Sequence, residues 1–380
     1  MVADASIPQI AVIGAGLAGA SCARALADAG LGVHLFDKSR GVGGRLATRR
    51  LQWVGQQGQT HCVEVDHGAV GFEAQSLAFQ AFAERHVERG VLALWQPTLA
   101  PEGLHDAQAQ APLYLPVPHM PALCRHLLEG LPQTLAWPVD SLHRVASGWL
   151  VQAGHAVHPA PFDAVLLALP PAQAAALLGP HRADWARHAS VTSMAPCWTL
   201  MGVADEPSQY AAQAWQAAKP AVGPLAWVIR QESRSGRVAV PGQSHWVAHA
   251  KPGWTRQHLD QPAPWVQAEL QAALEHCVGQ SLRWQHLQVH RWRYALPQPA
   301  KSVPAPISWW DADLGLGLCG DFLGGAGAEG AWLSAQSLGA AVLATYFDPA
   351  NPRATSVVRP GPTAVPFSDS VQTARSLRAV

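Results

Sequence analysis

Three glycines near the start of the chain have the spacing of a loop that binds a diphosphate. Gly14, Gly16 and Gly19 form the pattern G-x-G-x-x-G between an apolar run and an alanine-rich segment. The first glycine permits a tight turn, the second lets the backbone approach the diphosphate, and the third lets a helix pack close to a strand. The start of that helix offers backbone N–H groups to the phosphates. The pattern therefore predicts a dinucleotide site, and the alternative is an ordinary glycine turn.

A carboxylate follows where such a site needs one. Asp37 ends the segment GVHLFD, which we interpret as the second strand of a βαβ unit. At that position a carboxylate accepts hydrogen bonds from the ribose hydroxyls of an adenosine. It would also repel a 2′-phosphate on the same ribose.

A second glycine pair lies just beyond Asp37. Gly43 and Gly44 precede Arg45 in the segment GVGGRLATRR, and Arg45 or Arg49 can form paired hydrogen bonds to phosphate oxygens. A soluble NAD-dependent dehydrogenase has no need of this second loop, whereas FAD has a longer ribityl and isoalloxazine half to hold. The pair therefore favours non-covalent FAD, and the alternative is a flexible turn with solvated arginines.

The C-terminal part of the chain adds another carboxylate and a helix start. The string GLGLCG ends at Gly320 and has dinucleotide-loop spacing, but no helix follows it directly, so we interpret it as a strand. Asp321 comes next and can accept hydrogen bonds from hydroxyls, or it can simply cap a turn. Glu329, Gly330 and Ala331 begin the last predicted helix, whose N–H groups would stabilise an anionic reduced flavin. The alternative is a plain core helix.

Composition excludes several classes of partner. The chain has 380 residues, equal numbers of basic and acidic side chains, and only 14% charged residues, so neither nucleic acid nor an anionic membrane surface is indicated. The six cysteines show no C-x-x-C pair and no metal-ligand spacing. No stretch approaches the ~20 apolar residues of a membrane span. We therefore expect a cytoplasmic protein without a metal site, and the oligomeric state is left open.

The pattern of elements predicts an α/β fold with two domains. An apolar β-branched strand, a helix and a second strand open the chain as a Rossmann-type FAD-binding domain. Tryptophan-rich strand-like segments between residues 197 and 251 do not alternate with helices, which predicts a second, mostly antiparallel-sheet substrate domain.

Several segments together resemble the renalase-like flavoproteins, a branch of the FAD-linked amine oxidase superfamily. These segments are IGAGLAGASCARALADAG, GVGGR, DHGAVGF, LCGDFLGG and AEGAWLSAQSLGAAV, and the likeness extends over most of residues 8 to 347. It implies the amine-oxidase type of two-domain fold. The expected FAD-binding segments are 1–72, 120–170 and 315–348, the expected substrate-domain segments are 73–119 and 171–314, and the tail 349–380 is expected to be disordered.

The resemblance also implies positions for the cofactor. It places Asp66, Gly68 and Ala69 of DHGA near the flavin, and Asp321 on the ribityl chain or the diphosphate. The complete set that we expect to contact FAD is Gly14, Gly16, Leu17, Ala18, Gly19, Asp37, Lys38, Gly43, Gly44, Arg45, Asp66, His67, Gly68, Ala69, Gly320, Asp321, Glu329, Gly330 and Ala331.

Hydride transfer to a flavin needs a well-placed substrate and exclusion of water more than it needs a catalytic dyad. We name no certain catalytic residue; His67, Trp292 and Tyr294 are candidates for lining the substrate pocket, and ordinary core packing is the alternative for each. Lys301 is a further candidate, to hold a water, although its proline-rich surroundings favour an exposed loop. Many amine oxidases have a pair of tyrosines facing the flavin, whereas this chain has four tyrosines in all.

Three functions follow from these observations. The resemblance implies a renalase-like oxidase that converts misreduced dihydro isomers of NAD(P)H to NAD(P)⁺, with O₂ as electron acceptor and H₂O₂ as product. The second possibility is a flavin amine oxidase or desaturase of another small substrate. The third is a dinucleotide-binding protein without turnover.

Overall fold

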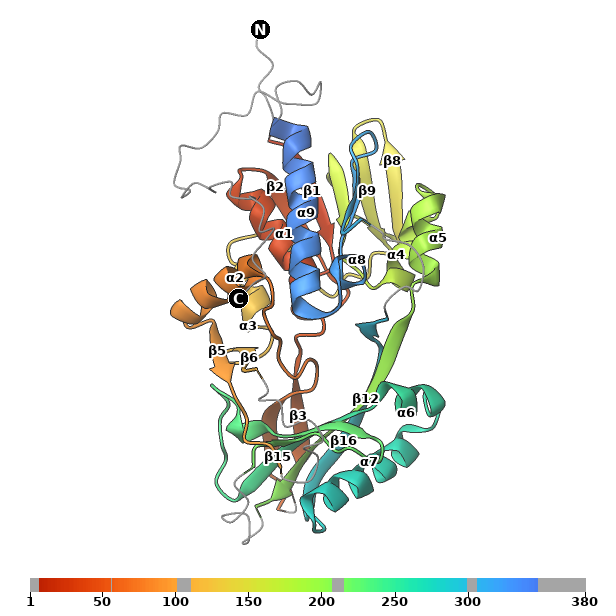
Figure 1. Ribbon diagram of the computed structural model, residues 1–380. Coiled ribbons are helices and arrows are strands. Elements are labelled where there is room, and N and C mark those ends of the chain that lie inside the picture. The colour runs from red at the N-terminus through yellow and green to blue at the C-terminus, as the bar shows by residue number, and fades with distance from the viewer. Residues whose placement is uncertain (1–6, 56, 101–110, 207–214, 299–305, 348–380) are drawn as a thin grey trace, which may run out of the picture.

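Two sheets at opposite ends of an elongated molecule organise the fold. The computed structural model describes residues 7–55, 57–100, 111–206, 215–298 and 306–347. The upper part in Figure 1 contains a six-stranded sheet, and the lower part contains a five-stranded sheet with helices along one side. This arrangement confirms the predicted α/β fold class with a Rossmann-type domain and a second, mostly antiparallel domain.

The six-stranded sheet is buried on both faces, as its apolar sequence predicts. Ile10 and Val12 of the first strand point into one core, and Ala11 and Ile13 point into the other. The strand order is β17-β18-β11-β1-β2-β7, with all neighbours parallel except the antiparallel edge strand β17. The strands are β1 (Gln9–Ile13), β2 (Gly32–Phe36), β7 (Gln133–Thr134), β11 (Ala164–Leu167), β17 (Trp309–Asp311) and β18 (Leu316–Leu318).

Different layers cover the two faces of this sheet. Helices α1 and α9 lie against one face and against each other, where Gly339 and Ala25 allow close approach. A three-stranded antiparallel sheet and two helices cover the other face. The elements are α1 (Leu17–Asp28), α2 (Leu77–Glu88), α3 (Ala122–Leu127), α8 (Asp321–Gly324) and α9 (Gly327–Phe347), and, on the second face, β8 (Ser141–Val145), β9 (Gly148–Ala153), β10 (Ala156–Val157), α4 (Pro171–Leu178) and α5 (Ala183–Val191).

The five-stranded antiparallel sheet has an inner and an outer face. Along β12, Trp198 and Leu200 point outward to the helix α7, whereas Met201 and Val203 point inward. Because strand side chains alternate, one strand serves two cores. The order is β13-β14-β15-β12-β16. The elements are β12 (Met194–Asp205), β13 (Ala217–Ala218), β14 (Leu225–Arg230), the 3₁₀-helix η2 (Gln231–Ser233), β15 (Gln243–Ala250), α6 (Pro252–Gln257), α7 (Ala263–Val278) and β16 (Trp284–Pro297).

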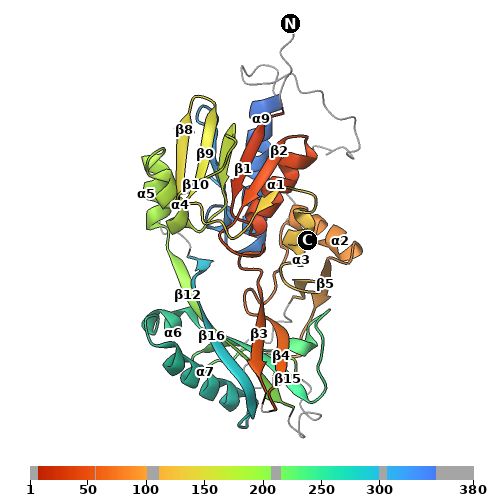
Figure 2. The ribbon, with the colours of Figure 1, turned by 180° about the vertical axis from the view of Figure 1, so that it is seen from behind.

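A long hairpin joins the two parts. The strands β3 (Thr48–Val54) and β4 (Thr60–Asp66) leave the Rossmann part and lie against the inner face of the lower sheet (Figure 2). Leu51, Val63 and Val65 of the hairpin pack there against Met201, Val203 and Val247. A second, shorter hairpin is formed by β5 (Leu92–Trp95) and β6 (Leu113–Pro116).

The structure differs from the expected segment boundaries at four places. Helix α2 packs in the upper core, although 73–119 was expected to form part of the substrate domain. Helices α4 and α5, and the edge strand β17, also belong to the upper part, although 171–314 was expected to form the substrate domain. The β3–β4 hairpin packs on the lower sheet, although 1–72 was expected to form the FAD-binding domain. An apolar periodicity shows that a segment has a face to bury but not which sheet will cover it. The expected disordered tail lies outside the described residues.

Candidate functional site

The first glycine loop has the shape that a bound diphosphate requires. Gly14 has φ +113°, and a Cβ there would overlap the carbonyl oxygen of Ala168. A Cβ on Gly19 would overlap the carbonyl oxygen of Gly14. At Gly16, in contrast, the nearest atom to a Cβ would be the Cα of Gly44 at 3.9 Å. Gly14 and Gly19 are therefore required by the fold itself, whereas Gly16 leaves open space beside the backbone.

The start of α1 is free to bind an anion. Its N-cap, Gly16, provides no side-chain hydrogen bond, and no acidic residue lies in the first turn. Leu17 and Ala18 begin the helix and are buried. Because unpaired N–H groups at a helix start attract negative charge, this donor set fits a diphosphate.

Asp37 and the second glycine pair lie beside this loop. The Asp37 carboxylate accepts the backbone N–H of Ala15 at 2.7 Å and that of Ser39 at 2.7 Å, and the residue is half-buried. Gly43 donates its N–H to the Ala15 carbonyl at 2.8 Å and pairs with Gly16 in an isolated bridge. The two glycine loops therefore face each other. Lys38 is exposed and bonds instead to Gln173 on α4.

Arg45 connects the second loop to two distant parts of the chain. Its guanidinium forms a paired interaction with Asp321, at 2.7 Å for each hydrogen bond, and also donates to the Ala295 carbonyl at 3.0 Å. Asp321 is 4% exposed and Arg45 is 35% exposed. Gly320, just before Asp321, donates its N–H to the hydroxyl of Ser334 on α9. The sequence predicted both Arg45 and Asp321 near the cofactor but not their direct pairing. The expectation that no helix directly follows Gly320 was wrong, because the short helix α8 begins at Asp321.

The 66–69 loop runs alongside Arg45. Ala69 donates its N–H to the Arg45 carbonyl at 2.9 Å, and His67 and Gly68 donate to the Ala47 carbonyl. A Cβ on Gly68 would overlap the Arg45 carbonyl oxygen, so only glycine fits there. The residues predicted from separate motifs thus form one continuous track, from the start of α1, through both glycine loops, to the junction with the lower sheet.

The start of α9 is tied to α2. The Glu329 carboxylate accepts the backbone N–H groups of Gln75 and Ser76, at 2.7 and 2.8 Å. Burial raises the pKa of Glu329, but these hydrogen bonds outweigh burial and leave the pKa below its usual value. Gly330 and Ala331 are buried, and a Cβ on Gly330 would overlap the Gly325 carbonyl oxygen. The Glu329 side chain therefore holds the helix start in place.

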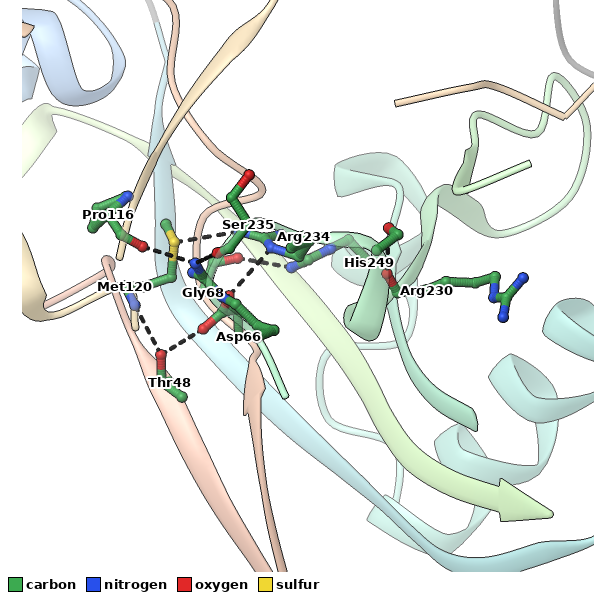
Figure 3. Close-up of polar contacts among 11 residues, drawn as sticks. Thr48, Asp66, Gly68, Pro116, Met120, Arg230, Arg234, Ser235 and His249 are labelled. Atoms are coloured by element: carbon green, nitrogen blue, oxygen red, sulfur yellow. Dashed lines mark hydrogen bonds and ion pairs between the residues drawn. The ribbon is translucent and has the colours of Figure 1, made fainter. Parts of the chain in front are cut away.

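Asp66 is the centre of a fully buried charge cluster (Figure 3). Its carboxylate accepts the Thr48 hydroxyl at 2.5 Å and the Nε of Arg237 at 2.7 Å, and the Nε of Arg234 lies 3.2 Å away. Burial raises the pKa of Asp66, but the two arginines and the Thr48 hydrogen bond lower it further than burial raises it. Asp66 is thus an anchor for its loop, and its carboxylate has no free side for a cofactor hydroxyl.

His67, Gly68 and their neighbours lie across the inner face of the lower sheet. His249 on β15 bonds through Nε2 to the Gly68 carbonyl at 2.8 Å, and Trp292 on β16 donates to the His67 carbonyl at 3.0 Å. The rings of His67, His290 and Trp292 contact one another at centroid distances of 4.7–5.0 Å. These side chains hold the 66–69 loop against the sheet.

The three histidines of this junction are neutral. Burial is the main cause that lowers the pKa of His67 to about 3 and the pKa values of His249 and His290 to about 4. The nearby Arg49 guanidinium lowers the pKa values of His67 and His290 further, and Arg234 does the same for His249. Protonated imidazole is therefore not available here near neutral pH.

The side chains on the inner face of β16 contact strand β3 and then the 66–69 loop. His286 stacks on Trp53 at 5.5 Å, Arg49 bonds to His290 and, in the amide orientation that satisfies both groups, to Gln288, and Trp292 meets His67. Tyr294 is the next inner residue, half-buried and adjacent to Ala295, whose carbonyl accepts Arg45. His67 and Trp292 are therefore in contact, and Tyr294 lies two residues farther along β16, next to the residue whose carbonyl binds Arg45.

The further candidate Lys301 lies outside the described residues. Two other histidines have partners away from this junction: His119 pairs with Glu64 on the hairpin, and His245 bonds to Gln243. Sequence reasoning missed Arg234, Arg237 and His249. The first two occur in the polar segment ESRSGR, which resembles a solvated turn, and nothing local marks them. Within the described ranges we find neither a helix long and apolar enough to span a membrane nor a grouping of three metal-binding side chains.

Comparison with known proteins agrees with this geometry. Residues 12–85 match the family model of an NAD(P)-binding Rossmann-like domain. A candidate protoporphyrinogen oxidase from Exiguobacterium sp. 255-15 superposes with a TM-score of 0.65 at 12% identity, over 89% of this chain and 99% of that one. Cyclohexylamine oxidase from Brevibacterium oxydans IH-35A gives 0.62 at 11% identity, over 89% and 99%.

An oxidoreductase from Methanosarcina mazei gives a TM-score of 0.58 at 15% identity, over 87% of this chain and 99% of that one. At such identities the likeness concerns the fold. The described chain therefore has the two-part architecture of these oxidoreductases along nearly their whole length, with the glycine loops and the 66–69 loop where the two parts meet.

Proposed function

We propose that this chain is an FAD-dependent oxidase of renalase type, which converts misreduced dihydro isomers of NAD(P)H to NAD(P)⁺. The observation that carries the proposal is the continuous track from Gly16 through Gly43 and Arg45 to Ala69. A nicotinamide cofactor alone would leave the distal part of this track without a ligand. An extended dinucleotide whose redox ring reaches the domain junction suits it better.

The chain's own residues have separate tasks in this proposal. Asp37 holds the adenosine ribose, and the N-terminus of α1 holds the diphosphate. Arg45 and Asp321 are a pre-aligned pair whose hydrogen bonds can be redistributed to the diphosphate and the ribityl hydroxyls. FAD, when bound, accepts a hydride from the substrate and passes two electrons to O₂, which takes up two protons to give H₂O₂.

The substrate would lie near the junction residues. Trp292 and Tyr294 offer aromatic surface to a planar ring, and the 66–69 loop, in which Asp66 and His67 are buried, would exclude water on one side. No protonated histidine is available to donate a proton, because all three are neutral. Positioning, rather than acid–base catalysis, is the contribution that these side chains can make.

One experiment tests both the cofactor and the substrate class. The purified protein should be yellow and release FAD on denaturation. Under anaerobic rapid mixing, 2- or 6-dihydro isomers of NAD(P)H should bleach the flavin absorbance, and air should restore it with formation of H₂O₂. A colourless protein that takes up no flavin contradicts the cofactor, and an unchanged spectrum with these isomers contradicts the substrate.

Amine oxidation is the second candidate, and the fold likeness to cyclohexylamine oxidase favours it. A panel of primary and secondary amines that bleaches the flavin faster than any dihydronicotinamide would decide for it. A bound dinucleotide whose redox state no donor changes would indicate a binding protein instead. The cytoplasmic location expected from the sequence stays a prediction.

A further inference from the structure

The buried cluster around Asp66 contains more positive than negative charge. The side chains of Asp66 and Arg234 are fully buried, and that of Arg237 is 4% exposed. One carboxylate therefore faces two guanidinium groups. Burial lowers the pKa of Arg234 to about 10, so Arg234 still carries its charge near neutral pH. The cluster as a whole has one positive charge in surplus.

Neutral groups complete the surroundings of the two arginines. Arg237 donates to the carbonyls of Pro116 and Ser235, and Arg234 donates to the sulfur of Met120 and lies over the ring of Trp95 at 5.3 Å. The Nη1 atom of Arg234 is buried and has no hydrogen-bond partner among the residues that the structure describes. These contacts stabilise the guanidinium groups without cancelling their charge.

Neighbouring carboxylates are already paired with other groups. Glu232 pairs with Arg230, whose side chain extends away from the cluster in Figure 3, and also accepts the His245 N–H. Asp321 is paired with Arg45, and Glu64 with His119. Arg49 on β3 has only His290 and Gln288 of β16 as side-chain partners among the described residues. Nothing in the described part of this region offsets the surplus.

The surplus charge lies directly behind the loop that lines the proposed site. Asp66 begins that loop, and His249, which contacts Gly68, is close enough to Arg234 for the guanidinium charge to lower the pKa of the imidazole. Inside a protein, a charge acts over many ångströms because little water screens it. We propose that Arg234 makes the domain-junction site select anionic or uncharged ligands over cations of the same shape. This inference rests on the proposed function and names its substrate class: hydride donors whose reacting ring is uncharged, rather than ammonium ions.

Three planar probes of nearly equal shape test the selection directly. Benzoate, benzamide and benzamidinium differ mainly in charge, and isothermal titration calorimetry measures their binding without reference to turnover. The expected order of affinity is benzoate, then benzamide, then benzamidinium. A shift in the wavelength of the flavin absorbance band on addition of benzoate would place the probe beside the cofactor. Tighter binding of benzamidinium than of benzoate would overturn the proposal.

Two substitutions should move the benzoate-to-benzamidinium affinity ratio in opposite directions. Arg234→Met keeps the volume and leaves a balanced Arg237–Asp66 pair, so the ratio should fall, on the order of tenfold. Asp66→Asn adds to the surplus, so the ratio should rise in the protein that still folds. A purely structural role would weaken all three probes alike in both variants. If the ratio in Arg234→Met equals that of the unsubstituted protein, the proposal is wrong whatever Asp66→Asn does.

Arg50→Gln is the matched control. Arg50 lies on β3 beside Arg49 but is exposed and pairs with Glu64 at 3.6 Å, so the ratio should not change. The outcome is separable from that of the proposed function. Protein that contains FAD but prefers benzamidinium contradicts only the charge selection. Protein that binds no FAD contradicts the proposed function, while calorimetry with the three probes still decides the selection.

Discussion

Two carboxylate–arginine sites lie near the 66–69 loop and differ in net charge and in solvent exposure. Asp321 and Arg45 form a one-to-one pair whose arginine is 35% exposed, whereas Asp66 faces two arginines with almost no exposed surface. The charges of the first site cancel, whereas the second site has one positive charge in surplus. In the two proposals above, the first site contacts the ligand and the second sets the local potential.

Removing each carboxylate in turn should show the largest contrast. Asp66→Asn leaves two buried guanidinium groups without a counter-charge, which should lower the free energy of unfolding by about 3–5 kcal/mol. Asp321→Asn leaves a partly exposed arginine that water can solvate, with an expected loss of about 1.5–2 kcal/mol. Denaturant unfolding followed by tryptophan fluorescence measures both. Equal losses would show that the two sites do not differ in the way that their burial indicates.

Acid should destabilise the domain junction, where three neutral histidines are buried or half-buried. The folded pKa values of His67, His249 and His290 are about 3 to 4, below about 6.5 in the unfolded chain. The unfolded state therefore binds more protons below about pH 6.5, so stability is complete above that pH and decreases on acidification. Each of the three histidines should therefore cost about 2 kcal/mol of stability between pH 7 and pH 5.

Unfolding free energies measured at several pH values test this slope. His249→Gln keeps a donor for the Gly68 carbonyl and removes one titrating group, so its slope should be shallower. A slope that is the same in both proteins would mean that folding does not lower the pKa of His249.

The proposed adenosine site is tested by substitution of Asp37, the carboxylate expected to bind the ribose. Asp37→Ala removes charge-assisted hydrogen bonds to the ribose and should weaken FAD binding by about 1.5–3 kcal/mol. Retention of FAD through gel filtration, followed by equilibrium titration of the apoprotein, measures the loss. Asp28→Ala is the control, because Asp28 is an exposed partner of Arg24 on α1. Undiminished FAD affinity in Asp37→Ala would contradict the assignment.

The smallest change in stability should come from Gly16→Ala. Gly16 has φ −75°, which alanine adopts freely, and nothing lies closer than 3.9 Å to its Cβ position. Stability should change by less than about 1 kcal/mol, yet the added methyl group occupies the space proposed for the diphosphate. FAD binding should therefore be lost while the unfolding midpoint is kept. A variant that binds FAD normally would place the diphosphate elsewhere.

Local sequence patterns predicted the Rossmann unit well. The apolar run before Gly14, the glycine spacing and the carboxylate of Asp37 all report interactions within a few residues or within one βαβ unit, and they occur in the structure as expected. The antiparallel sheet was also predictable, because its strands carry apolar residues on two faces. Secondary structure and motif placement depend mainly on such short-range information.

The charge cluster was not predictable, because its members are far apart in the chain. Asp66 meets Arg234 and Arg237 only after the hairpin has docked on the lower sheet. In sequence the two arginines have the polar neighbours of an exposed turn, and nothing local indicates that their side chains are buried. His249 was hidden for the same reason: its partner, the Gly68 carbonyl, is a backbone group that no residue type indicates.

The β3–β4 hairpin also constrains how this protein can be divided. A fragment without the hairpin would expose Met201, Val203 and Val247 to solvent on an otherwise intact sheet. Such an exposed hydrophobic patch favours self-association. A chimaera that replaces the Rossmann part with that of a related protein should therefore keep residues 48–66 of the original chain, because they pack on the antiparallel sheet. Although the hairpin is connected to the Rossmann part, it is structurally part of the lower domain.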